Sequence, residues 1–200
     1  GSLAVRSGGK LIIVDTGMQF PDSSGTLLTD MADKGVDRDA VNLVVITHLH
    51  PDHVGWNLTN GEPTFPNARY LIPKSDWEYW TKPDVLADAD HVRDQVLPLD
   101  KLKVMDLMED DYSITDDLTT VATPGHTPGH VSIVIVSNGE RGFILGDVAH
   151  SPAQAHRTDW NPGFDIDGET SRRTRHATLD RLESEGTLVA AGHFPTPGFG

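Results

Sequence analysis

One short stretch constrains the fold more than any other: residues 47–55 read Thr-His-Leu-His-Pro-Asp-His-Val-Gly. It follows residues 41–46, an apolar run rich in β-branched side chains, which predicts a buried strand. Alternate side chains of a strand share a face, so we expect His48 and His50 to point the same way. Pro51 then ends the strand, because proline fixes φ and lacks a backbone donor. The stretch therefore predicts a strand that ends in a cluster of polar side chains.

The polar side chains of this stretch are of the kinds that bind metal ions. They are three imidazoles and one carboxylate: His48, His50, Asp52 and His53. Nitrogen and oxygen ligands at this density suit zinc or a similar divalent metal. A single histidine is more often a polar loop residue, but a solvated loop has no need of three imidazoles at this spacing. We therefore predict a metal site here.

The composition is that of a globular protein. The 200 residues are enough for one domain with a sizeable core, and the charged share of 23% is ordinary. The 16 basic and 30 acidic residues give a net charge of −14. A field of that sign repels phosphate backbones, so we expect no nucleic-acid partner. The chain has no cysteine, so its metal ligands must be histidine and carboxylate.

No apolar run approaches the roughly 20 residues that span a bilayer, and no signal-peptide pattern is visible. We therefore expect a cytoplasmic protein with a small-molecule substrate and no membrane partner.

Trp77, Tyr79 and Trp80 form a local excess of aromatic side chains. A substrate pocket, core packing and a homodimer contact are all open for them.

The rest of the chain alternates predicted strands and helices. We predict strands over 10–14, 68–72, 103–108, 118–122, 131–136, 141–145 and 187–191, and helices over 27–34, 84–95 and 169–185. Residues 20–26 are rich in turn formers. His91, within the polar segment 84–95, is expected at the surface. Residues 149–163 predict an irregular loop long enough to be functional.

A metal-type ligand follows a strand and a glycine or proline turn at four places. They are the stretch at 48–53, His126, Asp147 and His193. Residues 123–130, Thr-Pro-Gly-His-Thr-Pro-Gly-His, predict a rigid loop suited to presenting a histidine at fixed geometry. Asp15 also follows a predicted strand. For Asp15 we leave open a helix cap or turn and a hydrogen-bond acceptor for a ligating histidine.

In this order the ligand-type residues resemble the signature of the metallo-β-lactamase superfamily. The match runs from Asp15 to His193 and so covers nearly the whole chain. The resemblance implies an α/β (α+β) fold, an αββα four-layer sandwich of two mainly antiparallel sheets with helices outside. It also implies a single domain over residues 1–200, and a first and a final strand of that fold are expected to lie outside the sequence.

The resemblance further implies two divalent metal ions, with zinc expected and iron, manganese or cobalt as alternatives. The first ion would be held by His48, His50 and His126. The second would be held by Asp52, His53 and His193, with Asp147 bridging both. Asp15 and His130 would support these ligands by hydrogen bonds.

Differences from particular groups of the superfamily, at positions 147 and 150, indicate which subfamily the chain resembles. Asp147 stands where one group of zinc β-lactamases has cysteine, which indicates a fully ligated two-metal site. Acyl-homoserine-lactone hydrolases have tyrosine three residues after the bridging aspartate, where this chain has His150. Methyl-parathion-hydrolase-like members have histidine at that position.

The activity that the resemblance implies is metal-assisted hydrolysis, in which a bridging hydroxide attacks a carbonyl carbon or a phosphorus. Asp52 would relay a proton to the leaving group. His150 would contact the substrate or leaving group, with a surface role as the alternative. The candidates for the substrate pocket, with core packing as the alternative, are Phe20, Trp56, Trp160 and Phe164.

A neutral ester or lactone is the expected substrate, because the chain carries aromatic residues near these motifs and no basic cluster that would bind an anion. Organophosphate triesters come second and β-lactams third. The alternative from another class is a mononuclear-iron sulfur oxygenase, which metal content would separate from a hydrolase.

Overall fold

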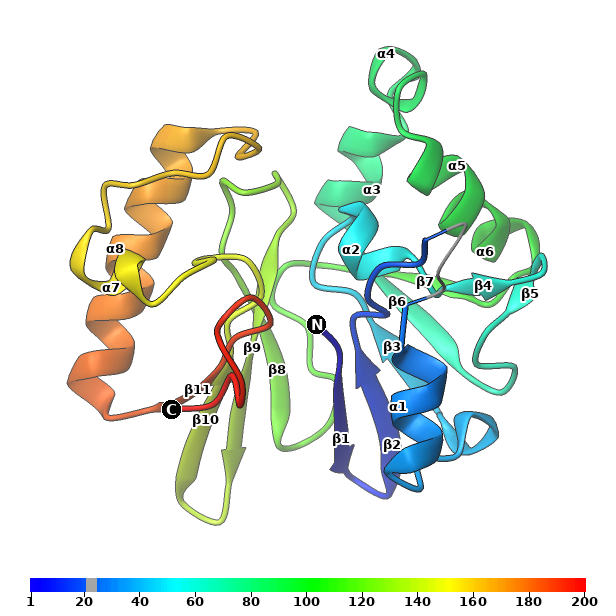
Figure 1. The fold of residues 1–200 in the computed structure, drawn as a ribbon, viewed down its shortest axis with the longest axis horizontal. Helices are drawn as coiled ribbons and strands as arrows, with labels where there is room; N and C mark the ends of the chain where they lie inside the picture. Colours follow the sequence, from blue (N-terminus) through cyan, green and yellow to red (C-terminus); the bar gives the residue numbers. More distant parts are fainter. Residues whose placement is uncertain (21–24) are drawn as a thin grey trace. The chain divides into compact units, whose positions relative to one another are not determined.

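A computed structural model describes residues 1–20 and 25–200 (Figure 1). The chain forms two compact units, each with its own sheet. The first comprises Gly1–Ile72 and Trp77–Met108, and the second comprises Pro73–Asp76 and Glu109–Gly200. The single domain over 1–200 stays a prediction, and residues 21–24 of the predicted turn-rich stretch lie outside the described residues. Among the described residues, no helix has the length and apolar character needed to cross a membrane.

The sheet of the first unit has the strand order β1-β2-β3-β6-β7. Its strands are β1 (Leu3–Ser7), β2 (Lys10–Val14), β3 (Leu43–Val45), β6 (Arg69–Pro73) and β7 (Met105–Met108). β1, which the sequence did not predict, pairs antiparallel with β2, whereas β2, β3 and β6 run parallel. Parallel strands end at the same edge of a sheet. Asp15, after β2, and the histidine stretch, after β3, therefore meet at one edge.

The first unit also contains a short ribbon and most of the small helices. These are β4 (Leu58–Thr59), β5 (Glu62–Pro63), α1 (Leu27–Asp33), the 3-10 helix η1 (Arg38–Ala40), α2 (Pro51–Val54), α4 (Pro83–Leu86), α5 (Asp90–Gln95) and α6 (Leu97–Lys101). Of α3 (Lys74–Trp80), residues 77–80 belong to this unit and residues 74–76 to the second. The predicted helix over 84–95 is therefore two helices. α5 packs on α2 and α6, and its Val92 joins Val44, Ile46 and Tyr70 in the core of this unit.

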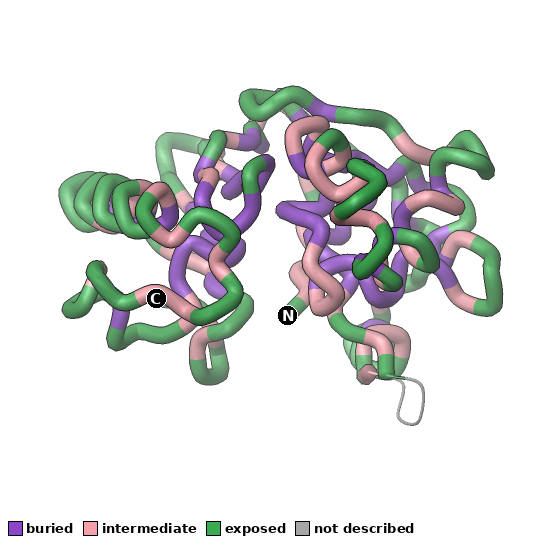
Figure 2. The backbone as a smooth tube through the Cα atoms, turned by 90° about the horizontal axis from the view of Figure 1, so that it is seen from above, coloured by how far each residue is buried: buried purple, intermediate pink, exposed green. Residues whose placement is uncertain are grey.

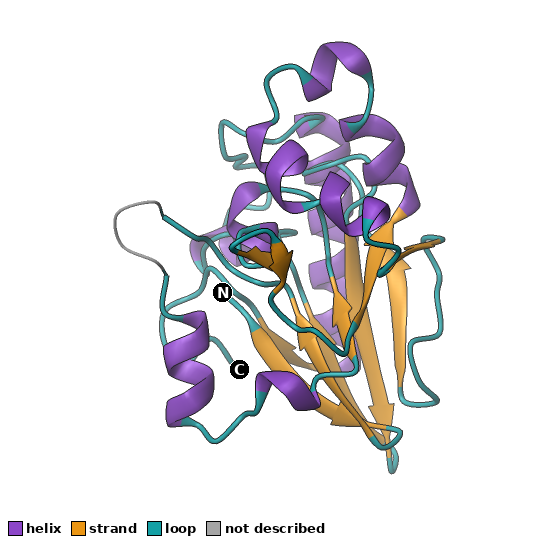
Figure 3. Cartoon of the chain, turned by 90° about the vertical axis from the view of Figure 1, so that its right-hand side faces the viewer, coloured by secondary structure: helices purple, strands orange, loops and turns teal. Residues whose placement is uncertain are grey.

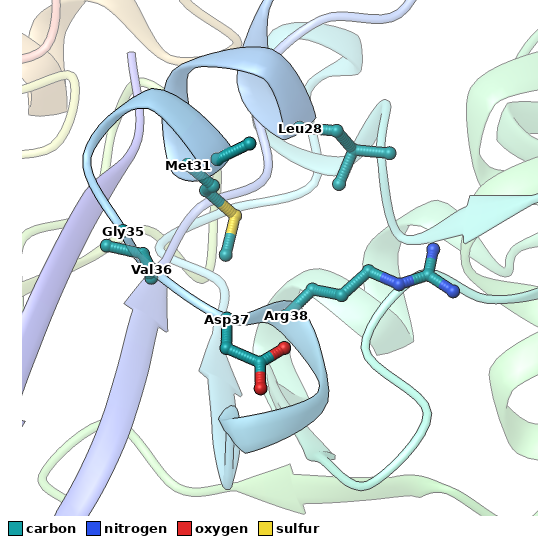
Figure 4. A pocket seen from close by; sticks show the side chains of 7 residues that line it. Leu28, Met31, Gly35, Val36, Asp37 and Arg38 are labelled. Carbon is teal, nitrogen blue, oxygen red and sulfur yellow. The ribbon is translucent and has the colours of Figure 1, made fainter.

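A hollow of about 400 Å³ lies beside α1 and η1 (Figure 4). Leu28, Met31 and Val36 supply much of its wall. None of its lining residues is a predicted site residue, and we assign it no function.

The sheet of the second unit has the order β11-β10-β9-β8. Its strands are β8 (Leu118–Ala122), β9 (Val131–Ser137), β10 (Glu140–Ile144) and β11 (Leu188–Ala190). Asn138 and Gly139, both with positive φ, form the hairpin turn between β9 and β10. Figure 3 shows the strands of the chain in orange and its helices in purple.

Two helices lie wholly in the second unit, α7 (Ala153–His156) and α8 (Gly168–Glu185). α8, predicted over 169–185, begins after Asp167, whose carboxylate accepts from two backbone N–H groups, and ends at Gly186 with φ +59°. Most of α8 is exposed (Figure 2). Its buried residues are Ser171, Arg175 and Leu182.

The topology of this sheet also gathers strand ends. β8 and β10 both pair antiparallel with β9 and so run in the same direction, and β11 runs parallel to β10. The carboxyl ends of β8, β10 and β11 therefore lie at one edge. His126, Asp147 and His193 follow these three strands, so the sheet brings together residues far apart in sequence.

Candidate metal centre

The histidine stretch connects β3 to α2 in the first unit. His48 and His50 offer nitrogens within 4.8 Å of each other, with ring centroids 4.9 Å apart. The ring centroid of His53, in the short helix α2, lies 4.0 Å from that of His48, and its Nε2 is 3.4 Å from Asp52 Oδ2. The structure therefore brings the four ligand-type side chains of this stretch together.

Asp15 lies beneath this cluster with φ +57°. Aspartate is one of the few residues other than glycine that tolerate this backbone region. Its buried carboxylate accepts from Thr47 N at 2.7 Å and from Thr47 Oγ1 at 2.9 Å, and it lies 2.8 Å from His53 Nδ1. With its Nδ1 proton donated to Asp15, the His53 ring keeps the lone pair of Nε2 for a metal.

His48 is held in the same tautomer by a neighbouring contact. Its Nδ1 lies 3.0 Å from Thr47 Oγ1. Because that hydroxyl gives its own proton to Asp15, it accepts the proton of His48 Nδ1. The network therefore assigns Nε2 of both His48 and His53 as lone-pair donors.

His91 is half-buried, which corrects the expected surface position. The reason is that α5 packs against α2, so His91 faces the histidine stretch, where its Nε2 donates to Leu49 O at 2.8 Å. Burial lowers the pKa of His91, although the Leu49 hydrogen bond and the charge of Asp52 oppose this. Trp80 packs edge-on against His50, at 5.6 Å, and against His91, at 5.1 Å.

The predicted pocket residues of the first unit separate into two kinds. Phe20, 49% exposed, lines a hollow of about 450 Å³ together with Pro51, Gly55 and His91. Trp56 is buried, and its indole N–H donates to Met18 O at 3.2 Å. The structure therefore favours core packing for Trp56 and places Phe20 beside the histidine stretch.

In the second unit three imidazoles converge on one carboxylate oxygen, Asp147 Oδ2. The Nε2 atoms lie at 3.0 Å for His150, 3.2 Å for His193 and 3.3 Å for His126. Asp147 and His126 are buried, whereas the His193 side chain is 31% exposed. Nδ1 of His150 is buried and has no hydrogen-bond partner among the described residues.

His126 is held through Nδ1, like His48 and His53 of the first unit. This atom lies 2.8 Å from Asp165 Oδ1. Burial alone would lower the pKa of His126, but hydrogen bonds to Asp147 and Asp165 outweigh burial and raise it. Burial would raise the pKa of Asp165, but its hydrogen bonds to His126 and Ser171 outweigh burial and lower it. The sequence did not predict Asp165, although it lies just after the predicted functional loop.

His130 is buried below Asp147. Its Nε2 accepts from Asp147 N at 2.8 Å, and its Nδ1 lies 3.1 Å from Thr123 O. Gly146 has φ +58°, and a Cβ there would lie 2.5 Å from His130 Nε2. Only glycine leaves room for this contact.

Two exposed aromatic rings belong to the loop before α8. Phe164 is 58% exposed, and its ring lies 5.1 Å from that of His150 and 5.7 Å from that of His126. Trp160 is 50% exposed and stacks on the guanidinium of Arg157 at 4.8 Å. Of these two predicted pocket residues, Phe164 touches the ligand-type histidines.

Two sets of side chains suit a divalent metal: those of the histidine stretch in the first unit and those around Asp147 in the second. Each set offers imidazole nitrogen and carboxylate oxygen, which are ligands for zinc and similar ions. Two atoms bound to one tetrahedral zinc at about 2.1 Å lie roughly 3.4 Å apart. The separation is 3.4 Å for Asp52 and His53, 3.2 Å for Asp147 and His193 and 3.3 Å for Asp147 and His126. The donor atoms therefore fit the metals that the sequence predicted.

Comparisons with known proteins agree with this chemistry. The profile of the family described as the metallo-beta-lactamase superfamily matches residues 2–193. N-acyl homoserine lactonase AttM of Rhizobium radiobacter is 31% identical over 165 residues, which are 80% of this chain and 61% of that protein. An N-acyl homoserine lactonase of Bacillus thuringiensis is 24% identical over 205 residues, covering 91% of this chain and 76% of that protein. The chain thus spans about three-fifths of the length of AttM.

Solved structures share the fold. Hydrolase AbOPH, described as a member of the beta lactamase superfamily, superposes with a TM-score of 0.91 at 27% identity, covering 100% of this chain and 73% of that one. The dizinc quorum-quenching lactonase AidC superposes with a TM-score of 0.88 at 24% identity, covering 98% of this chain and 73% of that one. The predicted fold class is confirmed, with parallel pairs at the centre of the first sheet. The chain belongs to the metallo-β-lactamase superfamily.

Proposed function

We propose that this protein is a metal-dependent hydrolase whose two sets of ligand-type side chains together hold two divalent ions, most suitably zinc. The observation that carries the proposal is the convergence of three imidazole nitrogens within 3.3 Å of Asp147 Oδ2. Following the order of the family signature, His48, His50 and His126 would hold one ion and Asp52, His53 and His193 the other. Asp147 would bridge both.

Such ions supply Lewis acidity, which polarises a carbonyl or phosphoryl oxygen and lowers the pKa of water toward about 7. The protein's own contribution is to hold the ligands in place. Asp15 and Thr47 hold His53 and His48 through their Nδ1 atoms. Asp52 is partly exposed, so its carboxylate can carry a proton to a leaving group.

We further propose a neutral lactone as the substrate, with an N-acyl homoserine lactone as the first choice. Two of the relatives described above are named N-acyl homoserine lactonases. The exposed rings of Phe20 and Phe164 offer apolar surface beside the two ligand sets. An acyl chain gains free energy on such surface, whereas the net charge of −14 disfavours polyanions.

An organophosphate triester is the second candidate. The observation that favours it is His150, which lies 3.0 Å from Asp147 at the position where the resemblance places tyrosine in lactone hydrolases and histidine in methyl-parathion-hydrolase-like members. His150→Tyr should therefore raise the ratio of lactone to triester turnover if His150 contacts the substrate. An unchanged ratio would assign His150 to holding Asp147.

Metal analysis and a substrate panel test the proposal. We expect two zinc ions per chain, hydrolysis of homoserine lactones, and loss of activity on chelation that added zinc restores. The panel also contains p-nitrophenyl esters, a paraoxon-type triester and a chromogenic cephalosporin. One iron per chain with no hydrolysis would favour the sulfur oxygenase instead.

A pair of variants distinguishes loss of the metal site from a general effect on folding. Asp147→Ala should abolish both metal binding and hydrolysis while circular dichroism stays native. Asp180→Ala is the matched control, because Asp180 is an exposed carboxylate on α8 that pairs with His176. Full hydrolysis by metal-stripped Asp147→Ala would refute the proposal.

A homodimer and a cytoplasmic location remain predictions, which light scattering and cell fractionation can test.

A further inference from the structure

Arg175, on α8, is a fully buried arginine. A buried guanidinium is costly unless every donor is paired. Its Nε donates to Val148 O at 2.8 Å, and its Nη2 donates to Ser171 Oγ at 2.9 Å. Its Nη1 reaches the loop before α8, donating to Thr158 O at 3.0 Å and Trp160 O at 2.7 Å. One side chain therefore ties α8 both to this loop and to the residue after Asp147.

The same guanidinium faces a buried carboxylate. Arg175 Nη2 lies 3.5 Å from Asp165 Oδ2, and both side chains are at most 1% exposed. The other oxygen of Asp165, Oδ1, lies 2.8 Å from His126 Nδ1. Asp165 therefore contacts both Arg175, on α8, and His126, a proposed metal ligand.

Backbone hydrogen bonds also join the segments that carry Asp165 and His126. Ile166 N donates to His126 O at 3.1 Å, and Asp167 N donates to Gly125 O at 2.9 Å. These bonds already fix the loop against the His126 segment. The buried pair of Asp165 and Arg175 is therefore not needed for that attachment, and its distinctive contact is with the imidazole.

We propose that Asp165 and Arg175 are a positioning pair that holds His126 with Nδ1 protonated and Nε2 available to a metal ion. Arg175 offsets the cost of keeping the Asp165 carboxylate ionised in the interior, and the ionised carboxylate accepts from His126 Nδ1. Asp15 and His53 have the same relation in the first unit, but there neutral donors of Thr47 accompany the carboxylate. The inference rests on the proposed function, in which His126 binds metal.

Metal affinity tests the pair. Asp165→Asn removes the charge at nearly constant size, and Arg175→Lys keeps a charge but loses the planar set of donors. Arg173→Ala is the matched control, because Arg173 makes an exposed ion pair with Glu169 on the same helix. Zinc affinity is measured by competition with a chromophoric chelator, and ligand geometry by the visible spectrum of the cobalt-loaded protein. We expect Asp165→Asn and Arg175→Lys to weaken one of two zinc sites about 10–100-fold, and Arg173→Ala to match the wild type.

Nitrogen NMR of the zinc-loaded protein takes its readout from the wild-type chain, and a variant serves only to assign the signal. We expect His126, assigned with His126→Gln, to carry a slowly exchanging proton on Nδ1. A proton on Nε2 instead would overturn the inference, as would wild-type zinc affinities in folded Asp165→Asn. A wild-type chain that binds two zinc ions while Asp165→Asn is unaffected refutes this inference alone. A wild-type chain that binds no zinc refutes the proposed function together with it.

Discussion

His130 Nε2 accepts a hydrogen bond from the backbone N–H of Asp147 at 2.8 Å. The other ring nitrogen of His130 contacts Thr123, whose carbonyl oxygen lies 3.1 Å away. Because Nε2 accepts and Nδ1 donates, the ring is a neutral imidazole that joins the end of β8 to the turn after β10. The position of Asp147 therefore depends on a histidine that is not itself a proposed ligand.

His130→Ala should destabilise the protein by about 2–4 kcal/mol, because it leaves Asp147 N and Thr123 O buried without their partner. Urea denaturation measures the loss. His176→Ala is the control, since this histidine on α8 is 63% exposed, and we expect a change within about 0.5 kcal/mol. Equal stability of the two variants would contradict a structural role for His130.

Gly146→Ala should be more damaging than Gly139→Ala. Both glycines have positive φ, so alanine costs about 1–2 kcal/mol of backbone strain at either position. A Cβ at Gly139 meets nothing within 4 Å, whereas one at Gly146 would lie 2.5 Å from His130 Nε2. The denaturation free energies of the two variants test this, and a loss at Gly146 no larger than that at Gly139 would mean that His130 moves away freely.

The sequence predicted the ligand-type residues because each follows a strand and a turn, which are local patterns. It did not predict every partner that holds them. The resemblance implied Asp15 and His130, but Asp165 is 39 residues from His126 and no local pattern connects the two. The same reason explains His91, whose hydrogen-bond acceptor, Leu49 O, is 42 residues away. The strand β1 was missed because only one of its five residues, Val5, is strongly β-forming and none is fully buried.

Asp15→Asn and Asp15→Ala should separate two roles of Asp15. Asparagine tolerates φ +57° and can accept from Thr47, so Asp15→Asn should keep the fold and weaken zinc binding about 10–100-fold. Alanine lacks the acceptor and tolerates this backbone poorly, so Asp15→Ala should lose at least about 2 kcal/mol of stability as well. Zinc competition and denaturation measure the two effects. Wild-type zinc affinity in Asp15→Asn would exclude the carboxylate charge from metal binding.

His91 predicts a pH dependence of stability. Burial lowers its pKa in the folded chain below the ordinary value of 6.5, so the unfolded chain binds a proton first as the pH falls. The contribution of His91 to the free energy of unfolding is fully present above pH 6.5. It is lost as the pH falls from 6.5 to the lower pKa that His91 has in the folded chain. Metal-free His91→Gln should therefore lose less stability than the metal-free wild type between pH 7 and pH 5. Parallel stability curves for the two proteins would contradict this assignment.

Phe164 should contribute to substrate binding, whereas Trp160 on the same loop should not. The Phe164 ring is 58% exposed and contacts His150 and His126, whereas the Trp160 ring stacks on Arg157. An acyl chain that covers Phe164 would gain about 25 cal/mol per Å² of apolar surface removed from water. Phe164→Ala should therefore raise KM for long-chain homoserine lactones about tenfold, with a smaller effect on short-chain ones, and Trp160→Ala should leave both unchanged. Equal changes for long and short chains would place the acyl group elsewhere.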